Sequence, residues 1–191
     1  MSIVIGIKYN NGVIVAGDKQ STKGNNARGE TIKIKKQKYS NSCFGCVGYS
    51  RDTNIIVSHD EIVNYKDILD NVEIDKNYVV NNIIPNLFNL YRNNNRVTNK
   101  EGIEYLNNEF IYCTSNKLFS IDADGAVTEY NDYVASGCGE DYVGGYLNNI
   151  DLGNLTKSEA IEVVNNAIKK ACKNDPYING NIDIIDIKRT S

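Results

Sequence analysis

The chain has 191 residues, of which 41% are hydrophobic, so it is long enough for one hydrophobic core and short for two full-sized domains. Its 21 basic and 24 acidic side chains give a formal net charge of -3 without a long basic run. This balance argues against a nucleic acid or an anionic membrane as the main partner. No stretch reaches the ~18 consecutive apolar residues of a membrane helix, and the N-terminus lacks the regions of a signal peptide. We therefore expect one cytoplasmic domain over residues 1–191.

Two apolar runs open the chain, residues 3–9 and 13–18, and Asn10-Asn11-Gly12 between them favours a tight hairpin turn. Both runs are apolar at almost every position, which is typical of strands that are covered on both faces. A polar loop over residues 21–30 then leads to a predicted strand over 31–37. Residues 42–47 have the pattern of its hairpin partner.

The hydrophobic period becomes helical after this hairpin. Between residues 51 and 91 the apolar positions predict two helices, the first including Ile55, Ile56, Ile62 and Val63. Pro85 lies inside the second helix and is expected to bend or break it.

Strand patterns return over residues 109–114, 117–121 and 126–130. The segment Asp122 to Gly125 has half the pattern of a calcium loop, but it lacks the distal Glu and is interpreted as a hairpin turn. A short helix is expected from residue 142 to 147, and Thr156-Lys-Ser-Glu159 is a capping box for a helix that ends near residue 174. Residues 182–187 complete the predicted elements as a strand.

The resulting order is strands, two helices, strands, two helices and a strand. Such pairs of helices between antiparallel strands predict an α+β fold, a four-layer α/β/β/α sandwich. Its two antiparallel sheets would pack face to face with the helices outside.

The cysteines give little sign of a metal or redox site. There are five of them, an odd number that favours reduced thiols: Cys43, Cys46, Cys113, Cys138 and Cys172. Cys43 and Cys46 have CxxC spacing, but a second ligand pair at matching spacing is missing and His59 lies on a predicted helix. The glycine-rich turn at 137–139 fits neither a phosphate loop nor a dinucleotide fingerprint. We predict no metal and no cofactor.

Two charged residues stand out from their surroundings. Asp18 ends a strand that is covered on both faces, where a carboxylate without a cation would be costly. Lys33 lies between Ile32 and Ile34 in a predicted strand, so we expect it to face opposite to both.

Several segments of the sequence resemble motifs of a known protein family. The segments Ser2-Ile-Val-Ile-Gly-Ile and Val15-Ala-Gly-Asp resemble the N-terminus of the catalytic β subunits of the proteasome and their bacterial HslV-type relatives. Five further segments resemble the family's later motifs in the same order, so that the match spans essentially the whole chain: Ile32 to Lys36, Phe44 to Gly48, Phe119 to Gly125, Ala135 to Gly139, and Lys173 to Ile184.

The resemblance implies a peptidase with an N-terminal nucleophile. In such enzymes the hydroxyl of the first residue attacks the scissile carbonyl, and its own α-amine takes the proton. The residues that this implies as catalytic, once Met1 has been removed, are Ser2, Asp18, Lys33, Gly45, Cys138 and Asp175. Gly45 would supply the oxyanion-binding amide, while Cys138 and Asp175 would support the amine. By the same resemblance Ser21, Cys43 and Val47 would line a small apolar specificity pocket.

The family pattern is broken at three positions, because Ser2 replaces the usual threonine, Cys138 a serine, and Ile178 a serine of the core proteasome subunits. These departures keep two alternatives open: a noncatalytic ring subunit, and an amidohydrolase acting on a small amide. The expected partners are further copies or related subunits in stacked rings, a separate ATPase unfoldase, and unfolded protein substrates.

Overall fold

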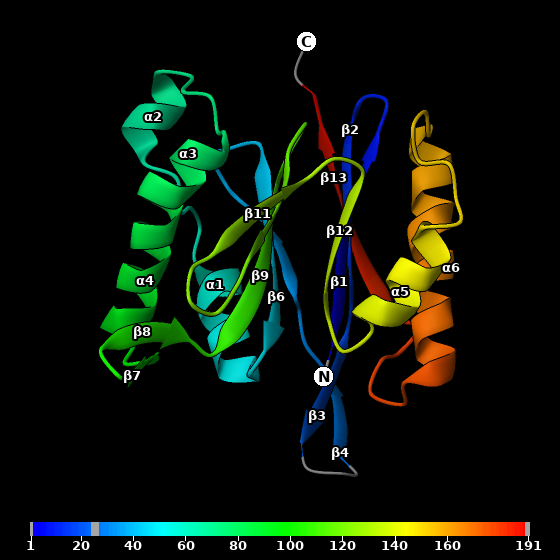
Figure 1. Cartoon of the computed structure of the whole chain (residues 1–191), viewed down its shortest axis with the longest axis horizontal. Helices are drawn as coiled ribbons and strands as arrows, with labels where there is room; N and C mark the ends of the chain where they lie inside the picture. The colour runs from blue at the N-terminus through cyan, green and yellow to red at the C-terminus, as the bar shows by residue number, and fades with distance from the viewer. Residues whose placement is uncertain (1, 24–26, 190–191) are drawn as a thin grey trace.

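The computed structural model describes residues 2–23 and 27–189. They form four layers, α/β/β/α, in which two antiparallel sheets pack face to face (Figure 1). Helices α1 and α4 cover the outer face of one sheet, and α5 and α6 cover the outer face of the other. The predicted four-layer sandwich is therefore confirmed. Within the described residues, none of the helices is long and apolar enough to cross a membrane.

The first sheet has the strand order β12-β1-β2-β13, with every neighbouring pair antiparallel. Its strands are β1 (Ile3–Tyr9), β2 (Gly12–Asp18), β12 (Tyr133–Gly137) and β13 (Ile182–Lys188). β1 and β2 are buried at almost every position, because one face packs on α5 and α6 and the other packs on the second sheet. Their continuous apolar runs follow from this double coverage.

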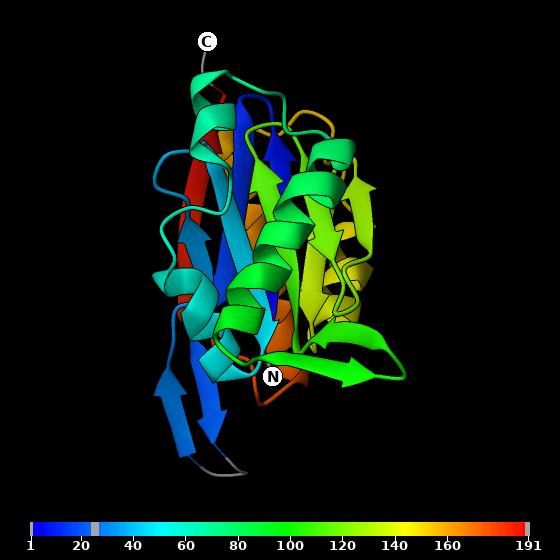
Figure 2. The same cartoon turned by 90° about the vertical axis from the view of Figure 1, so that its left-hand side faces the viewer.

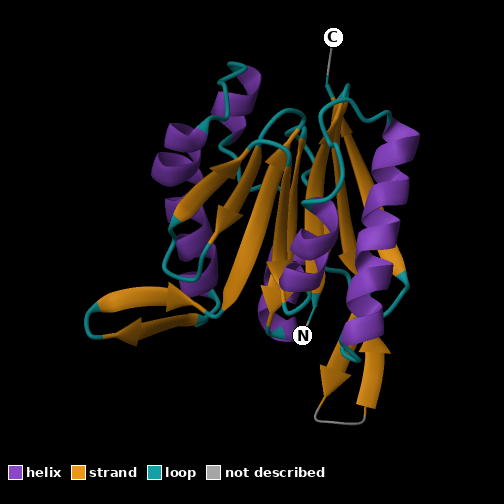
Figure 3. Ribbon diagram, turned by 45° about the vertical axis from the view of Figure 1, so that its right-hand side comes forward, coloured by secondary structure: helices purple, strands orange, loops and turns teal. Residues whose placement is uncertain are grey.

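The second sheet has the order β11-β10-β9-β6-β5 and is also antiparallel. Its strands are β5 (Ile34–Lys36), β6 (Ser42–Gly48), β9 (Asn108–Thr114), β10 (Leu118–Ile121) and β11 (Val127–Tyr130). Two separate hairpins, β3 (Gln20–Lys23) with β4 (Ala27–Glu30) and β7 (Val97–Lys100) with β8 (Ile103–Leu106), project beyond the sandwich (Figure 3).

The helical layer over the second sheet is more broken than the sequence pattern predicts (Figure 2). It contains α1 (Ser50–Ser58), α2 (Tyr65–Leu69), α3 (Lys76–Tyr78), a π-helical turn η1 (Val79–Ile83) and α4 (Ile84–Asn93). The prediction of two helices was wrong at Ile62 and Val63, which lie in the loop after α1. Pro85 lies in the first turn of α4, which continues directly from the π-helical turn η1, so the expected break is a local change from π-helical to α-helical hydrogen bonding within a continuous helix.

The other helical layer matches its prediction closely. It consists of α5 (Glu140–Leu147) and α6 (Lys157–Asn174). Both hydrogen bonds of the predicted capping box are present at the start of α6, between Thr156 and Glu159. The apolar stripe of α6 packs on β1 and β2, so this helix fixes the outer face of the first sheet.

Three further expectations were wrong. Residues 21–30 were expected to form a loop, but they contain most of the β3–β4 hairpin. In addition, the sequence pattern missed β12 and the β7–β8 hairpin. The strand expected over 31–37 is limited to β5. Ile32 is 55% exposed whereas Ile34 is buried, so the two do not share a face.

Candidate active site

A buried ion pair lies at the end of β2. The Asp18 carboxylate accepts hydrogen bonds from the Ile3 amide at 2.8 Å and the Gln20 amide at 3.0 Å. The Lys33 ammonium donates to the same carboxylate at 2.6 Å. Asp18 is fully buried, and a carboxylate in such a place is expected to need a cation. Lys33 is that cation. The carboxylate thereby joins the start of β1 to the segment that enters β5.

Lys33 is almost as buried as its partner. Burial lowers the pKa of its ammonium, and the Asp18 charge and hydrogen bond oppose this change. A lysine in such a place is held by one carboxylate and cannot move into solvent without breaking the pair. The prediction that the two charges are buried and paired is therefore confirmed by the geometry.

Ser2 directly precedes β1 and is buried. Its carbonyl oxygen accepts a hydrogen bond from the Cys138 thiol, with 3.4 Å between sulfur and oxygen. Gly137 packs against the same carbonyl: a Cβ atom there would lie 2.2 Å from the Ser2 oxygen, and its φ is +115°. Only glycine allows so close an approach. The turn after β12 thus fixes the backbone of Ser2.

Asp175 follows α6 and accepts the Tyr177 amide at 2.8 Å. Burial and, after it, the hydrogen bond with Asp175 raise the pKa of the Cys138 thiol to about 11, while the Ser2 backbone acts in the opposite direction. Cys138 is therefore protonated at neutral pH and can donate. Cys138 contacts Ser2 directly, and Asp175 contacts the Cys138 thiol.

Ser2 opens onto a cavity of about 760 Å³. The cavity is bounded by the end of β6, the β7–β8 hairpin, the start of β9 and the turn between β12 and α5. Its lining residues include Ser2, Thr22, Val47, Gly48, Ser50, Lys100, Tyr105, Glu109, Cys138 and Glu140. This is a space in which a peptide segment could lie against Ser2.

The structure corrects the expected position of the oxyanion-binding glycine. Gly45 lies in the middle of β6, paired with Ile34 and Ile111, and it does not line the cavity. Backbone groups along a strand point to alternate edges. The Cys46 amide donates to the Lys33 carbonyl at 2.9 Å, so the Gly48 amide, two residues on, points to the same edge beyond the last paired residue of β5. Gly48 lines the cavity, and Gly45 does not.

The predicted pocket residues have mixed outcomes. Val47 lines the cavity, and the Ser21 hydroxyl lies 3.2 Å from the hydroxyl of Ser50, which also lines it. Cys43 is wrong as a pocket residue, because it is fully buried between the two sheets, opposite Cys113. Ser50 was missed by the sequence reasoning. It could have been found only by continuing past Gly48 along the chain.

No group of three or more His, Cys, Asp or Glu side chains that could hold a metal ion occurs in residues 2–23 and 27–189. The charges of the site are thus supplied by Asp18, Lys33 and the residues around the cavity.

Comparisons of sequence connect this arrangement to a family. The family model described as "Proteasome subunit" matches residues 2–187. Proteasome subunit beta 1 of Pyrobaculum arsenaticum is 39% identical over 72 residues, which are 38% of this chain and 35% of that protein. Proteasome subunit beta 2 of Hyperthermus butylicus is 32% identical over 76 residues, 40% of this chain and 35% of that protein. The match thus spans about a third of these curated relatives.

Solved structures share the fold at low sequence identity. The Anbu (Gly-1) mutant from Hyphomicrobium sp. strain MC1 gives a TM-score of 0.75 at 12% identity, with 98% of this chain and 82% of that chain covered. HslV from Trypanosoma brucei gives 0.66 at 16% identity, covering 98% and 99%. Thiobacillus denitrificans BPH in complex with Epoxomicin gives 0.74 at 14% identity, covering 99% and 100%. With the family match over nearly the whole sequence, the chain belongs to the proteasome subunit family.

Proposed function

We propose that this chain is a peptidase subunit that cleaves peptide bonds of unfolded proteins, with the Ser2 hydroxyl as nucleophile. The observation that carries the proposal is the position of Ser2, which lines a peptide-sized cavity and adjoins the buried Asp18–Lys33 pair. Ser2 becomes the first residue only if Met1 is removed, and Met1 lies outside the described residues. Such removal is expected because Ser2 is small.

The chemistry needs a base, since a hydroxyl is a weak nucleophile by itself. The Ser2 α-amine, with an ordinary pKa of ~7.7–8.0, is neutral in a useful fraction near pH 8 and would take the hydroxyl proton. The Lys33 ammonium, which Asp18 ties to the neighbouring residue, favours the neutral amine by repulsion. The Ser2 oxygen then bonds to the scissile carbon, the C–N bond breaks, and the proton leaves on the departing amine. Water hydrolyses the resulting ester.

The Gly48 amide is our candidate donor to the oxyanion. Gly48 lines the cavity and its amide points to the β5 edge of β6, beyond the last paired residue, so it is not used in strand pairing; a donor of this kind contributes roughly 2.7–4 kcal/mol in other hydrolases. The Cys138 thiol holds the Ser2 carbonyl and so orients the nucleophile.

We further propose that the chain assembles into stacked rings of identical or related proteasome-type subunits and works with an ATPase that unfolds substrates. A noncatalytic ring subunit is the competing function, motivated by Cys138 in place of serine. An amidohydrolase for small amides is the third possibility, which release of peptides from an unfolded protein would distinguish. All three predict the same fold and differ in what Ser2 does.

The proposal is tested by intact mass, labelling and hydrolysis together. We expect loss of one methionine, covalent labelling of Ser2 by epoxomicin, and hydrolysis of unfolded casein. Ser2→Ala should remove labelling and hydrolysis while leaving the unfolding temperature unchanged, and Ser2→Thr should retain both. Retained Met1 without labelling, or equal hydrolysis by the Ser2→Ala variant, would show that this site is not the source of activity.

A further inference from the structure

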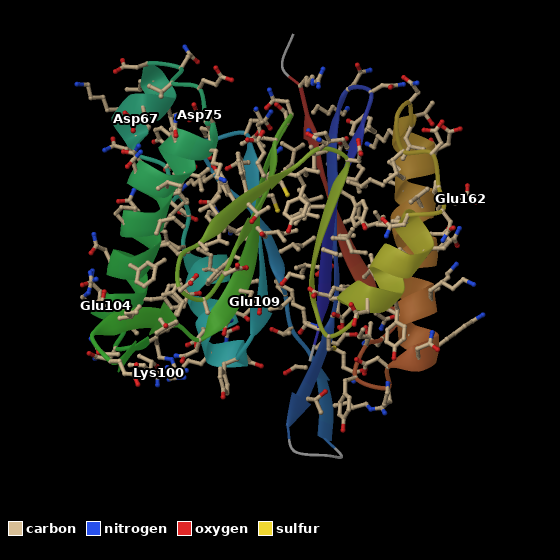
Figure 4. All side chains as sticks on the ribbon, in the orientation of Figure 1. Asp67, Asp75, Lys100, Glu104, Glu109 and Glu162 are labelled. Carbon is tan, nitrogen blue, oxygen red and sulfur yellow. The ribbon has the colours of Figure 1, made fainter. Side chains whose placement is uncertain are left out.

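The cavity in front of Ser2 is unevenly charged. The charged side chains of its lining are Glu109, Glu140 and Lys100. Glu109 lies on β9 and Lys100 lies on the β7–β8 hairpin, well separated from each other (Figure 4). The two carboxylates and the ammonium therefore occupy different parts of one cavity.

Both carboxylates line the same cavity as Ser2, next to the turn that contacts it. The Ser136 hydroxyl on β12 donates to the Glu109 carboxylate on β9 at 2.9 Å, so this bond joins the two sheets. Ser136 immediately precedes Gly137, which packs against the Ser2 carbonyl. Glu140 follows in the first turn of α5. Two negative groups thus flank the turn that holds the proposed nucleophile.

Neither carboxylate is paired with a cation in the part of the chain that the structure describes. Within residues 2–23 and 27–189, no salt bridge involves Glu109 or Glu140. Burial raises the pKa of the Glu140 carboxyl, and the charges of Glu109, Asp141 and Asp122 add to this, while the Gly137 amide opposes it. A positive group between Glu109 and Glu140 would relieve this repulsion. A negative group there would increase it.

We propose that Glu109 and Glu140 make the cavity selective for substrates with a lysine or arginine side chain next to the scissile bond. The selectivity rests on the proposed peptidase function, because it is the Ser2 nucleophile that places the scissile bond near these carboxylates. Lys100 gives the hairpin end of the cavity the opposite sign, and its ammonium lies 5.9 Å from the centre of the Tyr105 ring. Acidic side chains are thus tolerated toward the hairpin and excluded beside Ser2.

Binding tests the selectivity without catalysis. Fluorescein-labelled decapeptides that differ only by Arg, Leu or Glu at a central position are titrated against the Ser2→Ala variant, and Kd is read from anisotropy. Partly exposed ion pairs contribute up to ~1 kcal/mol each, so we expect Arg over Glu by about tenfold at low salt. The ratio should fall in high salt, because screening shortens the reach of the carboxylates.

Charge reversal separates recognition from general damage. In a double variant, Glu109→Lys with Glu140→Lys, the two negative charges become two positive charges and the order should invert to Glu over Arg, which loss of structure would not produce. Glu140→Lys alone leaves Glu109 beside the new lysine and should bring the ratio close to one. Glu162→Gln is the matched control, because Glu162 is exposed on the outer helix α6 (Figure 4), and it should leave the ratio unchanged. A ratio near one in the parent, or an order that the double variant does not invert, overturns the inference.

Hydrolysis of the same peptides by the chain with Ser2 intact then distinguishes the two proposals. Cleavage at equal kcat/KM for Arg and Glu peptides would support the peptidase and overturn the selectivity. Charge-dependent binding without cleavage or Ser2 labelling would overturn the proposed peptidase function. Selectivity would then not be a property of the reaction, and the cavity would be a peptide-binding cleft that prefers cationic side chains.

Discussion

Replacement of Asp18 by asparagine tests the buried ion pair at the centre of the site. The amide oxygen of asparagine can still accept from the Ile3 amide, which now bonds the carboxylate at 2.8 Å, so the backbone geometry has a means to persist. The charge that balances Lys33 is lost. Breaking a buried pair by removing one partner costs about 3–5 kcal/mol in other proteins.

The electrostatic part of this cost has an upper limit, because Lys33 can release its proton. That release costs about 1.36 kcal/mol for each of the roughly 3.4 pH units between 7.0 and the ordinary lysine pKa of ~10.4, or about 4.6 kcal/mol. We therefore expect the Asp18→Asn variant to lose about 3–5 kcal/mol of unfolding free energy at pH 7.

The pH dependence follows from the direction of the Lys33 pKa. Burial already lowers it, and without Asp18 it must fall further. Between the folded and unfolded pKa values the unfolded state binds more protons, so stability rises with pH. At pH 9.5 the limit set by deprotonation is about 1.2 kcal/mol. The destabilisation should therefore shrink by at least half between pH 7.0 and 9.5.

Urea unfolding followed by circular dichroism at a fixed protein concentration measures both values. Asp183→Asn is the matched control, because its partner Lys19 lies 3.6 Å away at the surface and such pairs contribute about 0–1 kcal/mol. A cost below 1 kcal/mol for Asp18→Asn at pH 7, or a cost that does not change with pH, would refute the account of Lys33 as a buried, compensated charge.

Three further outcomes follow from local geometry. Thr156→Ala removes the N-cap of α6 and should cost about 1 kcal/mol in chemical unfolding. Gly48→Ala should lower the unfolding free energy by about 1–3 kcal/mol and reduce peptide hydrolysis, because φ of Gly48 is +131° and the new Cβ would lie 2.5 Å from the Asn108 Oδ1 atom. Gly145→Ala is its control: Gly145 lies in helix α5 with open space around it, so this variant should raise the unfolding free energy by about 1 kcal/mol. Alkylation of Cys138 by iodoacetamide, followed by peptide mass, should keep rising up to pH 10, because its thiol pKa is about 11; a plateau near pH 9 would contradict this.

The predictable parts of the fold are those with strong local signals. The capping box fixed the start of α6 because its two hydrogen bonds involve residues three apart in sequence. The runs of β1 and β2 indicated coverage on both faces because burial between two layers removes the need for polar alternation. Both signals are independent of the rest of the chain.

The missed elements are short and project from the core. β7 and β8 have four residues each and largely half-buried or exposed side chains, so they lack a period-two hydrophobic pattern. β12 was hidden for another reason, since its last residues were interpreted only as a glycine turn. Its pairing with β1 depends on contacts more than 120 residues away in sequence, which a local pattern does not contain.

The site shows the same division. Asp18 required a cation because its strand is buried on both faces, and Lys33 supplies it. Gly45 was expected to bind the oxyanion because the segment from Phe44 to Gly48 resembles a family motif with two glycines, of which the first has that role. Only the direction of the Cys46 amide decides between them in favour of Gly48. That direction is a property of strand pairing.

The proposed chemistry is divided between the two sheets, and this makes the packing between them part of the site. Ser2 and Gly137 belong to the first sheet, whereas Gly48 and Glu109 belong to the second. Polar contacts cross the interface between the sheets, among them Lys33 with Asp18 and Ser136 with Glu109. The side chains between the sheets are almost entirely apolar and buried. They set the distance between the two sheets, but apolar packing does not fix how one sheet is positioned over the other. The polar contacts fix this relative position, because a hydrogen bond holds its two partners within a few tenths of an ångström. The proposed site therefore depends on both kinds of contact at once.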